Sequence, residues 1–212
     1  PMVSFGLLLA LWIILTTAVG VRDRIRNVRS GLVTQLARQP RGYWGMVTAH
    51  LGIAVFIIGV TVVKGYETER DVRMGIGDAI TVGAYTYRFD GVTESIGPNY
   101  KAARGSVDIS RQGRHDTTLY PEKRVYNASG TPMTEAAIES GPFGDRYVSL
   151  GEPVEGGAWS VRIYSKPFVT WIWEGCLLMG LGGVLALSDR RYRVSARRDT
   201  ALPEGAGPAP AA

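Results

Sequence analysis

The stretch Gly45-Met-Val-Thr-Ala-His-Leu-Gly-Ile-Ala-Val-Phe-Ile-Ile-Gly-Val-Thr-Val-Val63 is apolar except for one ionisable side chain, that of His50. At ~1.5 Å per residue, a helix over this stretch crosses most of a hydrocarbon core of ~30 Å. An ionisable group inside a bilayer costs roughly 2.5 kcal/mol or more, so its presence there indicates function. Neutral imidazole is also a ligand of metal ions and haem iron. We therefore predict a membrane-spanning helix with His50 as its functional residue.

Residues 2–21 and 168–187 are two further apolar runs, and each is about long enough to span a bilayer. The first run fits a signal peptide poorly because no Lys or Arg precedes it, and the missing initiator Met suggests a fragment or a processed chain. The predicted order is a membrane helix at 1–21, a basic loop at 22–43, the His50 helix at 44–63, an outer domain at 64–166, a third membrane helix at 167–187 and a tail at 188–212.

Arginine dominates both the loop after the first span and the tail after the third span. The positive-inside rule predicts that loop and tail are cytoplasmic and that the segment 64–166 lies outside. The basic pI of about 9.5 is therefore a sign of membrane topology. Nucleic acid is not expected as a partner, because the arginines adjoin the spans and lack interleaved aromatic residues. The Pro-, Gly- and Ala-rich end of the tail, after about residue 199, is predicted to be disordered. The arginines are Arg22, Arg24, Arg26, Arg29, Arg38 and Arg41 in the loop, and Arg190, Arg191, Arg193, Arg197 and Arg198 in the tail.

The outer segment is typical of an all-β domain. Its short stretches are β-branched or aromatic, and most of them alternate, so they are predicted to be strands. Gln112-Gly113 is a predicted hairpin turn. About a hundred residues of short strands favour a small sandwich or a partly closed barrel. We find no metal-spaced cluster, nucleophile-base pair or phosphate-binding loop there, and we assign no catalytic residue. The predicted strands are 79–89, 105–110, 117–120, 146–150 and 159–164.

Three other reactive side chains each have a simple interpretation. His115 is most simply a solvated loop residue, with a ligand role as the alternative. Cys176 is the only cysteine, so the chain has no internal disulfide and no Cys-x-x-Cys pair, and we expect its thiol to be buried as an apolar group. Glu174, inside the third span, either reaches the membrane interface, binds a basic partner on a neighbouring helix or belongs to a proton path.

Trp44, Trp171 and Trp173 lie near the ends of the predicted spans. Amphipathic indole rings favour membrane interfaces, so we interpret them as anchors. Trp171 and Trp173 are also suited to packing against a flat cofactor or another subunit, and this alternative stays open.

Seven phrases, in their order and spacing, resemble the C-terminal part of the CcmF family, the membrane subunit of the bacterial cytochrome c haem lyase. The resemblance covers nearly the whole chain except the tail. The phrases occupy residues 44–52, 69–74, 97–100, 119–124, 133–138, 166–173 and 185–192.

The resemblance implies a part in the apparatus that takes haem from a periplasmic haem chaperone and attaches its vinyl groups to the cysteines of apocytochrome c. It implies that His50 is an axial ligand of a haem b within the inner membrane, that the β domain is periplasmic and that other maturation subunits are partners. In that family a second membrane histidine and two haem-handling histidines lie upstream of the matched part. The chain is therefore expected to be a fragment or a split subunit, without activity alone. Glu174 stands where the family usually has a small or apolar residue, and we interpret it as a partner contact.

Two other functions remain open from the sequence. One is a membrane scaffold that assembles maturation subunits, with His50 hydrogen-bonded between helices. The other is a transporter or proton path through His50 and Glu174, although three spans without broken helices or an internal repeat give a transport site little support.

Overall fold

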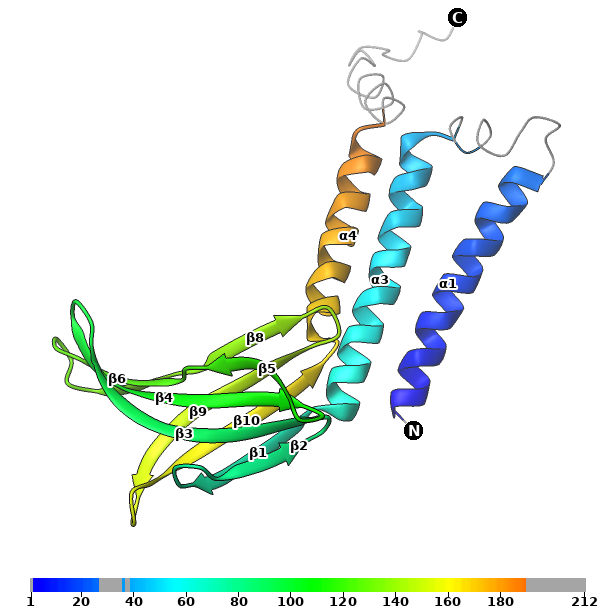
Figure 1. Ribbon diagram of the computed structural model, residues 1–212. Coiled ribbons are helices and arrows are strands. Elements are labelled where there is room, and N and C mark those ends of the chain that lie inside the picture. The colour runs from blue at the N-terminus through cyan, green and yellow to red at the C-terminus, as the bar shows by residue number, and fades with distance from the viewer. Residues whose placement is uncertain (1, 27–35, 37–38, 190–212) are drawn as a thin grey trace, which may run out of the picture. The chain divides into compact units, whose positions relative to one another are not determined.

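The computed structural model describes residues 2–26, 36 and 39–189. Within them the chain forms three helices and ten strands (Figure 1). Each helix is long and apolar enough to cross a membrane. The helices are α1 (Met2–Arg26), α3 (Arg41–Tyr66) and α4 (Val169–Leu187). The predicted fold class, three membrane helices with an inserted all-β domain, is confirmed. Arg29, Arg38 and the predicted tail from Arg190 onward lie outside the described residues.

The helices differ from the predicted spans at their ends. Helix α1 continues to Arg26 and so includes Arg22 and Arg24, which the sequence had assigned to the basic loop. Helix α3 begins at Arg41 and ends at Tyr66, beyond the apolar run at both ends. Helical hydrogen bonding does not require apolar side chains, so a helix can continue past the apolar segment into polar surroundings.

The chain divides into two compact units, Pro1–Leu7 with Ile57–Trp173, and Leu8–Phe56 with Glu174–Ala212. The first unit contains the β domain, a sandwich of two antiparallel sheets. In the four-stranded sheet the order is β1-β10-β9-β8, and in the six-stranded sheet it is β2-β3-β4-β6-β7, with β5 paired to β4. The strands are β1 (Thr68–Met74), β2 (Ala79–Val82), β3 (Tyr85–Ile96), β4 (Tyr100–Arg111), β5 (Arg114–Leu119), β6 (Glu122–Tyr126), β7 (Pro132–Glu135), β8 (Ala137–Gly141), β9 (Gly144–Val154) and β10 (Ala158–Pro167).

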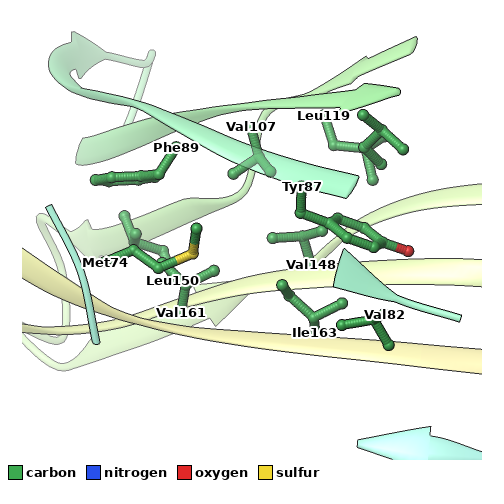
Figure 2. Packing of buried hydrophobic residues seen from close by; sticks show 11 residues of the cluster. Met74, Val82, Tyr87, Phe89, Val107, Leu119, Val148, Leu150, Val161 and Ile163 are labelled. Atoms are coloured by element: carbon green, nitrogen blue, oxygen red, sulfur yellow. The ribbon is translucent and has the colours of Figure 1, made fainter. Parts of the chain in front are cut away.

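The sandwich core is built from alternate residues of the long strands (Figure 2). Because side chains alternate between the two faces of a strand, every second residue of β3, β4, β9 and β10 points inward. Cross-strand pairs such as Phe89 with Val107 and Ile163 with Val148 therefore bury their side chains on one face. The fully buried members are Tyr87, Phe89, Val107, Ile109, Val148, Leu150, Val161 and Ile163.

Two turns show how the backbone sets the strand limits. Gln112 and Gly113 both have positive φ angles, 52° and 76°, and connect β4 to β5 as predicted. The predicted single strand at 79–89 is wrong, because the chain turns at Gly83, where φ is 63°, and β2 pairs back onto β3. A glycine between two β-branched stretches is the signal that marks this hairpin.

In the second unit, α3 and α4 pack backbone to backbone through glycines seven residues apart. A Cβ atom at Gly45 would lie 2.6 Å from the Ala186 nitrogen, and one at Gly182 would lie 2.6 Å from the Ala49 nitrogen. One heptad away, Gly52 and Gly175 meet in the same manner, each with main-chain atoms of the facing helix within 2.8 Å of an added Cβ. Small residues allow this close approach, which is how helices associate where no hydrophobic driving force exists. We call these four residues, Gly45, Gly52, Gly175 and Gly182, the glycine seam.

Asp189, just after the end of α4, links this helix to the first turn of α3. Its carboxylate accepts a hydrogen bond of 2.9 Å from the main-chain N–H of Gly42, in the first turn of α3, and its side chain is largely buried. The first N–H groups of a helix have no partner within the helix, and an aspartate there acts as a cap. The order of the contacts shows that α3 and α4 run antiparallel.

Candidate functional site

His50 lies in the middle of α3 with its imidazole exposed on the surface of the helical unit. Its Nδ1 is 2.8 Å from the main-chain carbonyl oxygen of Met46, one turn earlier. A carbonyl oxygen only accepts hydrogen bonds, so Nδ1 must carry the hydrogen. In the neutral imidazole the lone pair is then on Nε2, and no group among the described residues hydrogen-bonds to that nitrogen. A carbonyl contact of this kind is the usual way in which a ligand histidine is oriented.

A cavity of about 240 Å³ adjoins the imidazole. Its wall on α1 is made of small residues, and at Gly20 an added Cβ would meet no atom within 4 Å. The hydroxyl of Thr16 donates to the Trp12 carbonyl oxygen at 2.8 Å, so its hydrogen needs no acceptor in the cavity. The lining residues are Thr16, Thr17, Gly20, Tyr43, Met46 and His50.

These residues are compatible with His50 as a ligand of haem iron. The site offers one nitrogen lone pair, held in place by its own helix, beside a wall without bulky side chains. Both the imidazole and Met46, whose side chain is 45% exposed, face outward, so the described residues form one side of a site rather than an enclosed pocket. The sequence contains one other histidine, His115, which belongs to the β domain.

The structure corrects two sequence interpretations of reactive side chains. Cys176 is exposed rather than buried, because Gly175 occupies the face of α4 that meets α3 and the next residue turns away from it. His115 lies in β5 rather than in a loop, and its Nδ1 is 2.7 Å from the carboxylate of Asp108. Its side chain is exposed, and it belongs to a surface pair far along the chain from His50.

Trp171 ties the start of α4 to the turn between β8 and β9. Its indole N–H donates to the Pro142 carbonyl oxygen at 2.9 Å, and its ring packs edge-on against Phe168 at 4.9 Å between centroids. Trp173, two residues later, is 70% exposed. Glu174 is also exposed and makes no hydrogen bond or ion pair with any described residue. Its predicted contact with a partner stays a prediction.

A cluster of charges in the β domain escaped the sequence analysis because its members come from four strands. Arg146 of β9 pairs with Asp116 and Glu139, and its guanidinium lies 4.1 Å from the centre of the Tyr85 ring. Burial acts to lower the pKa of Arg146, but the hydrogen bond and charge of Asp116 outweigh it, so this pKa is raised. Nearby, burial raises the pKa of Tyr87 to about 12. The cluster pairs its own charges and, among the described residues, no group of acids or histidines is arranged to hold a metal ion.

Comparisons with known proteins agree on one family. Residues 65–167 match the family model described as the CcmF C-terminal beta-sandwich. The cytochrome c-type biogenesis protein CcmF of Pseudomonas aeruginosa is 49% identical over 191 residues, which are 90% of this chain and 29% of that protein. The protein of the same name from Escherichia coli is 43% identical over 203 residues, which are 96% of this chain and 30% of that protein.

A solved structure titled Cytochrome c Heme Lyase CcmF has the same fold, with a TM-score of 0.70. At 20% sequence identity the match covers 88% of this chain and 30% of the solved one. The chain thus spans about three tenths of the length of the relatives that it matches.

Proposed function

We propose that this chain, which belongs to the CcmF family, is the haem b-binding membrane part of a cytochrome c haem lyase. The observation that carries this proposal is the imidazole of His50, which lines the cavity, with Nδ1 hydrogen-bonded to the Met46 carbonyl oxygen and the lone pair left on Nε2. A membrane helix gains nothing from an exposed ionisable side chain unless that side chain has a ligand or a partner.

In this proposal each residue of the site has a defined part. Nε2 of His50 is one axial ligand, and the Met46 carbonyl oxygen fixes the ring's tautomer and orientation. Thr16, Thr17 and Gly20 leave space along one face of the ring. When bound, haem b would supply a one-electron redox centre within the bilayer.

The β domain is proposed to lie in the periplasm and to present a docking surface to the haem chaperone, to apocytochrome c and to other maturation subunits. The Arg-rich ends of the helices are proposed to lie on the cytoplasmic side of the inner membrane.

The test is a reduced-minus-oxidised absorption spectrum of the protein purified from membranes in detergent. We expect a b-type haem signal in the parent and its loss in His50→Ala. Ile53→Ala, on a neighbouring turn of α3 and outside the cavity lining, is the matched control and should keep the signal. Retention of the full signal in His50→Ala, or its absence from the parent, would refute the haem site and favour the scaffold function.

The scaffold alternative with His50 as a link between helices has less support from the contacts. The hydrogen bond of His50 stays within α3, and the close contacts between α3 and α4 are made by the glycine seam. His50→Ala should therefore leave the assembly of the helices intact, which gel filtration of the variant would check.

A further inference from the structure

Arg24, in the last turn of α1, stacks on Tyr43, one of the residues that line the His50 cavity. Its guanidinium carbon lies 4.5 Å from the centre of the Tyr43 ring, and its Nε donates to the side-chain oxygen of Gln39 at 2.8 Å. Both contacts fix the position of the guanidinium, and neither neutralises its charge. Among the described residues, no carboxylate pairs with Arg24, so its two terminal NH₂ groups remain free to bind an anion.

Tyr43 connects this cation to the cavity. Tyr43 and His50 are seven residues apart on α3, which is about two turns or ~10 Å along one face of the helix. Both line the cavity, as does Gly20, which lies one turn before Arg24 on α1. The phenolic oxygen of Tyr43 is buried and has no hydrogen-bond partner within the described part of the chain. The cavity is thus lined by both His50 and Tyr43, and the guanidinium of Arg24 stacks on the Tyr43 ring.

We infer that Arg24 is the counter-ion of a haem propionate when haem is bound at His50, with Tyr43 positioning the guanidinium. This inference rests on the proposed haem b. A haem is a flat apolar disc with two carboxylates along one edge, so its site needs an axial ligand, a wall of small residues and a cation displaced along the wall from the iron. Arg24 supplies that cation, and the planar guanidinium pairs with a carboxylate through two parallel hydrogen bonds.

The phosphate of a lipid headgroup is the other anion that an arginine at a helix end can meet. The stacking of Arg24 on Tyr43 favours the propionate, because it holds the guanidinium against a residue that lines the same cavity as His50. The two anions are distinguished by changing the haem and not the membrane.

The experiment measures the midpoint potential and the content of haem b in the protein purified from membranes in detergent. Without Arg24 the negative charge of the propionate is uncompensated and favours the ferric state, so Arg24→Gln should lower the potential, and Arg24→Lys should lower it less. The matched control is Arg26→Gln, two residues later in the same helical turn and without the stacking on Tyr43 that Arg24 makes, and it should leave the potential unchanged. If Arg24→Gln retains too little haem to measure, Arg24→Lys supplies the potential.

Reconstitution with haem dimethyl ester, in which both propionates are uncharged, completes the test. The difference in potential between the parent and Arg24→Gln should then be much smaller than with ordinary haem, because only the direct effect of the arginine charge on the iron remains. An unchanged potential in Arg24→Gln with ordinary haem would overturn the inference, and so would a difference that persists undiminished with the ester, which would indicate a lipid or a general field effect. If His50→Ala loses its haem, either of these results overturns the propionate inference and leaves the haem site standing. If His50→Ala retains its haem, the haem site is refuted as well.

Discussion

The two ring nitrogens of His50 have different surroundings, and this difference decides what the residue can do. Nδ1 is engaged by the Met46 carbonyl oxygen within α3, which leaves Nε2 as the only lone pair. The sequence singled out this residue because an ionisable group is costly in a bilayer, but it did not indicate the tautomer. The tautomer follows from the hydrogen bond to the main-chain carbonyl oxygen of Met46, four residues earlier in the same helix.

Tyr87 is the residue whose burial should set the alkaline limit of the β domain. Its pKa is raised to about 12 by burial, against about 10 in an unfolded chain. Between these values the folded state keeps a proton that the unfolded state has lost, so the free energy of unfolding should fall as the pH rises from about 10 to 12. We expect Tyr87→Phe to remove this part of the pH dependence, as measured by denaturant unfolding at pH 8 and pH 11.

The same variant should change stability little at pH 8. The Tyr87 hydroxyl is buried without a hydrogen-bond partner among the described residues, so its removal loses no bond and relieves a desolvation cost of about 1 kcal/mol. Tyr87→Ala is the contrasting variant, and its cavity should cost about 3–5 kcal/mol. A large loss of stability in Tyr87→Phe would mean that the hydroxyl has a partner in solution.

At the scale of elements, the glycine seam determines how closely α3 and α4 approach. We expect Gly182→Ala to force these helices apart, since its Cβ would lie 2.6 Å from the Ala49 nitrogen, and to cost about 1–3 kcal/mol. Gly183→Ala is the matched control, because a Cβ there meets nothing within 4 Å and alanine favours a helix over glycine by up to ~1 kcal/mol. Thermal denaturation in detergent should show opposite shifts for the two variants, and equal shifts would argue against the seam.

The strands illustrate which local signals are reliable. Alternation identified the inward-facing stretches of β3, β4, β9 and β10, because burial on one face imposes a period of two. Strand β1 was missed, since Glu69, Asp71 and Arg73 make it look polar, although Val72 and Met74 alternate with them. Its carboxylate at Asp71 is bound by Arg162 and Ser160 of β10, whose hydrogen bonds lower the Asp71 pKa. Such partners lie about ninety residues away and leave no pattern in the local sequence.

For the whole molecule, the proposed topology predicts which side of the membrane each segment meets. In a Cys176→Ser background, a cysteine at Ser129, in the exposed turn between β6 and β7, should react in intact spheroplasts with a maleimide that cannot cross membranes. A cysteine at Asp23, near the end of α1, should react only after the membrane is opened. Labelling of Asp23→Cys in intact spheroplasts would reverse the proposed orientation.

The sequence by itself determined the parts of this protein that depend on neighbouring residues. Twenty apolar residues are enough to specify a span, arginines beside a span bias its orientation, and a histidine within one is costly wherever the helix packs. For the same reason His50 could be singled out without any knowledge of its neighbours in space. The sequence also contains glycines seven residues apart in α3 and in α4, but only the structure shows that they are the points where the two helices make close contact.

Only the tertiary structure decided which surfaces these elements share. It turned Cys176 outward, split the strand at Gly83, gathered Arg146 with Asp116 and Glu139, and brought Arg24 of α1 over Tyr43 of α3 beside the His50 cavity. The physical reason is that close packing and ion pairing join residues far apart in the chain, where geometry and not local propensity selects the partner.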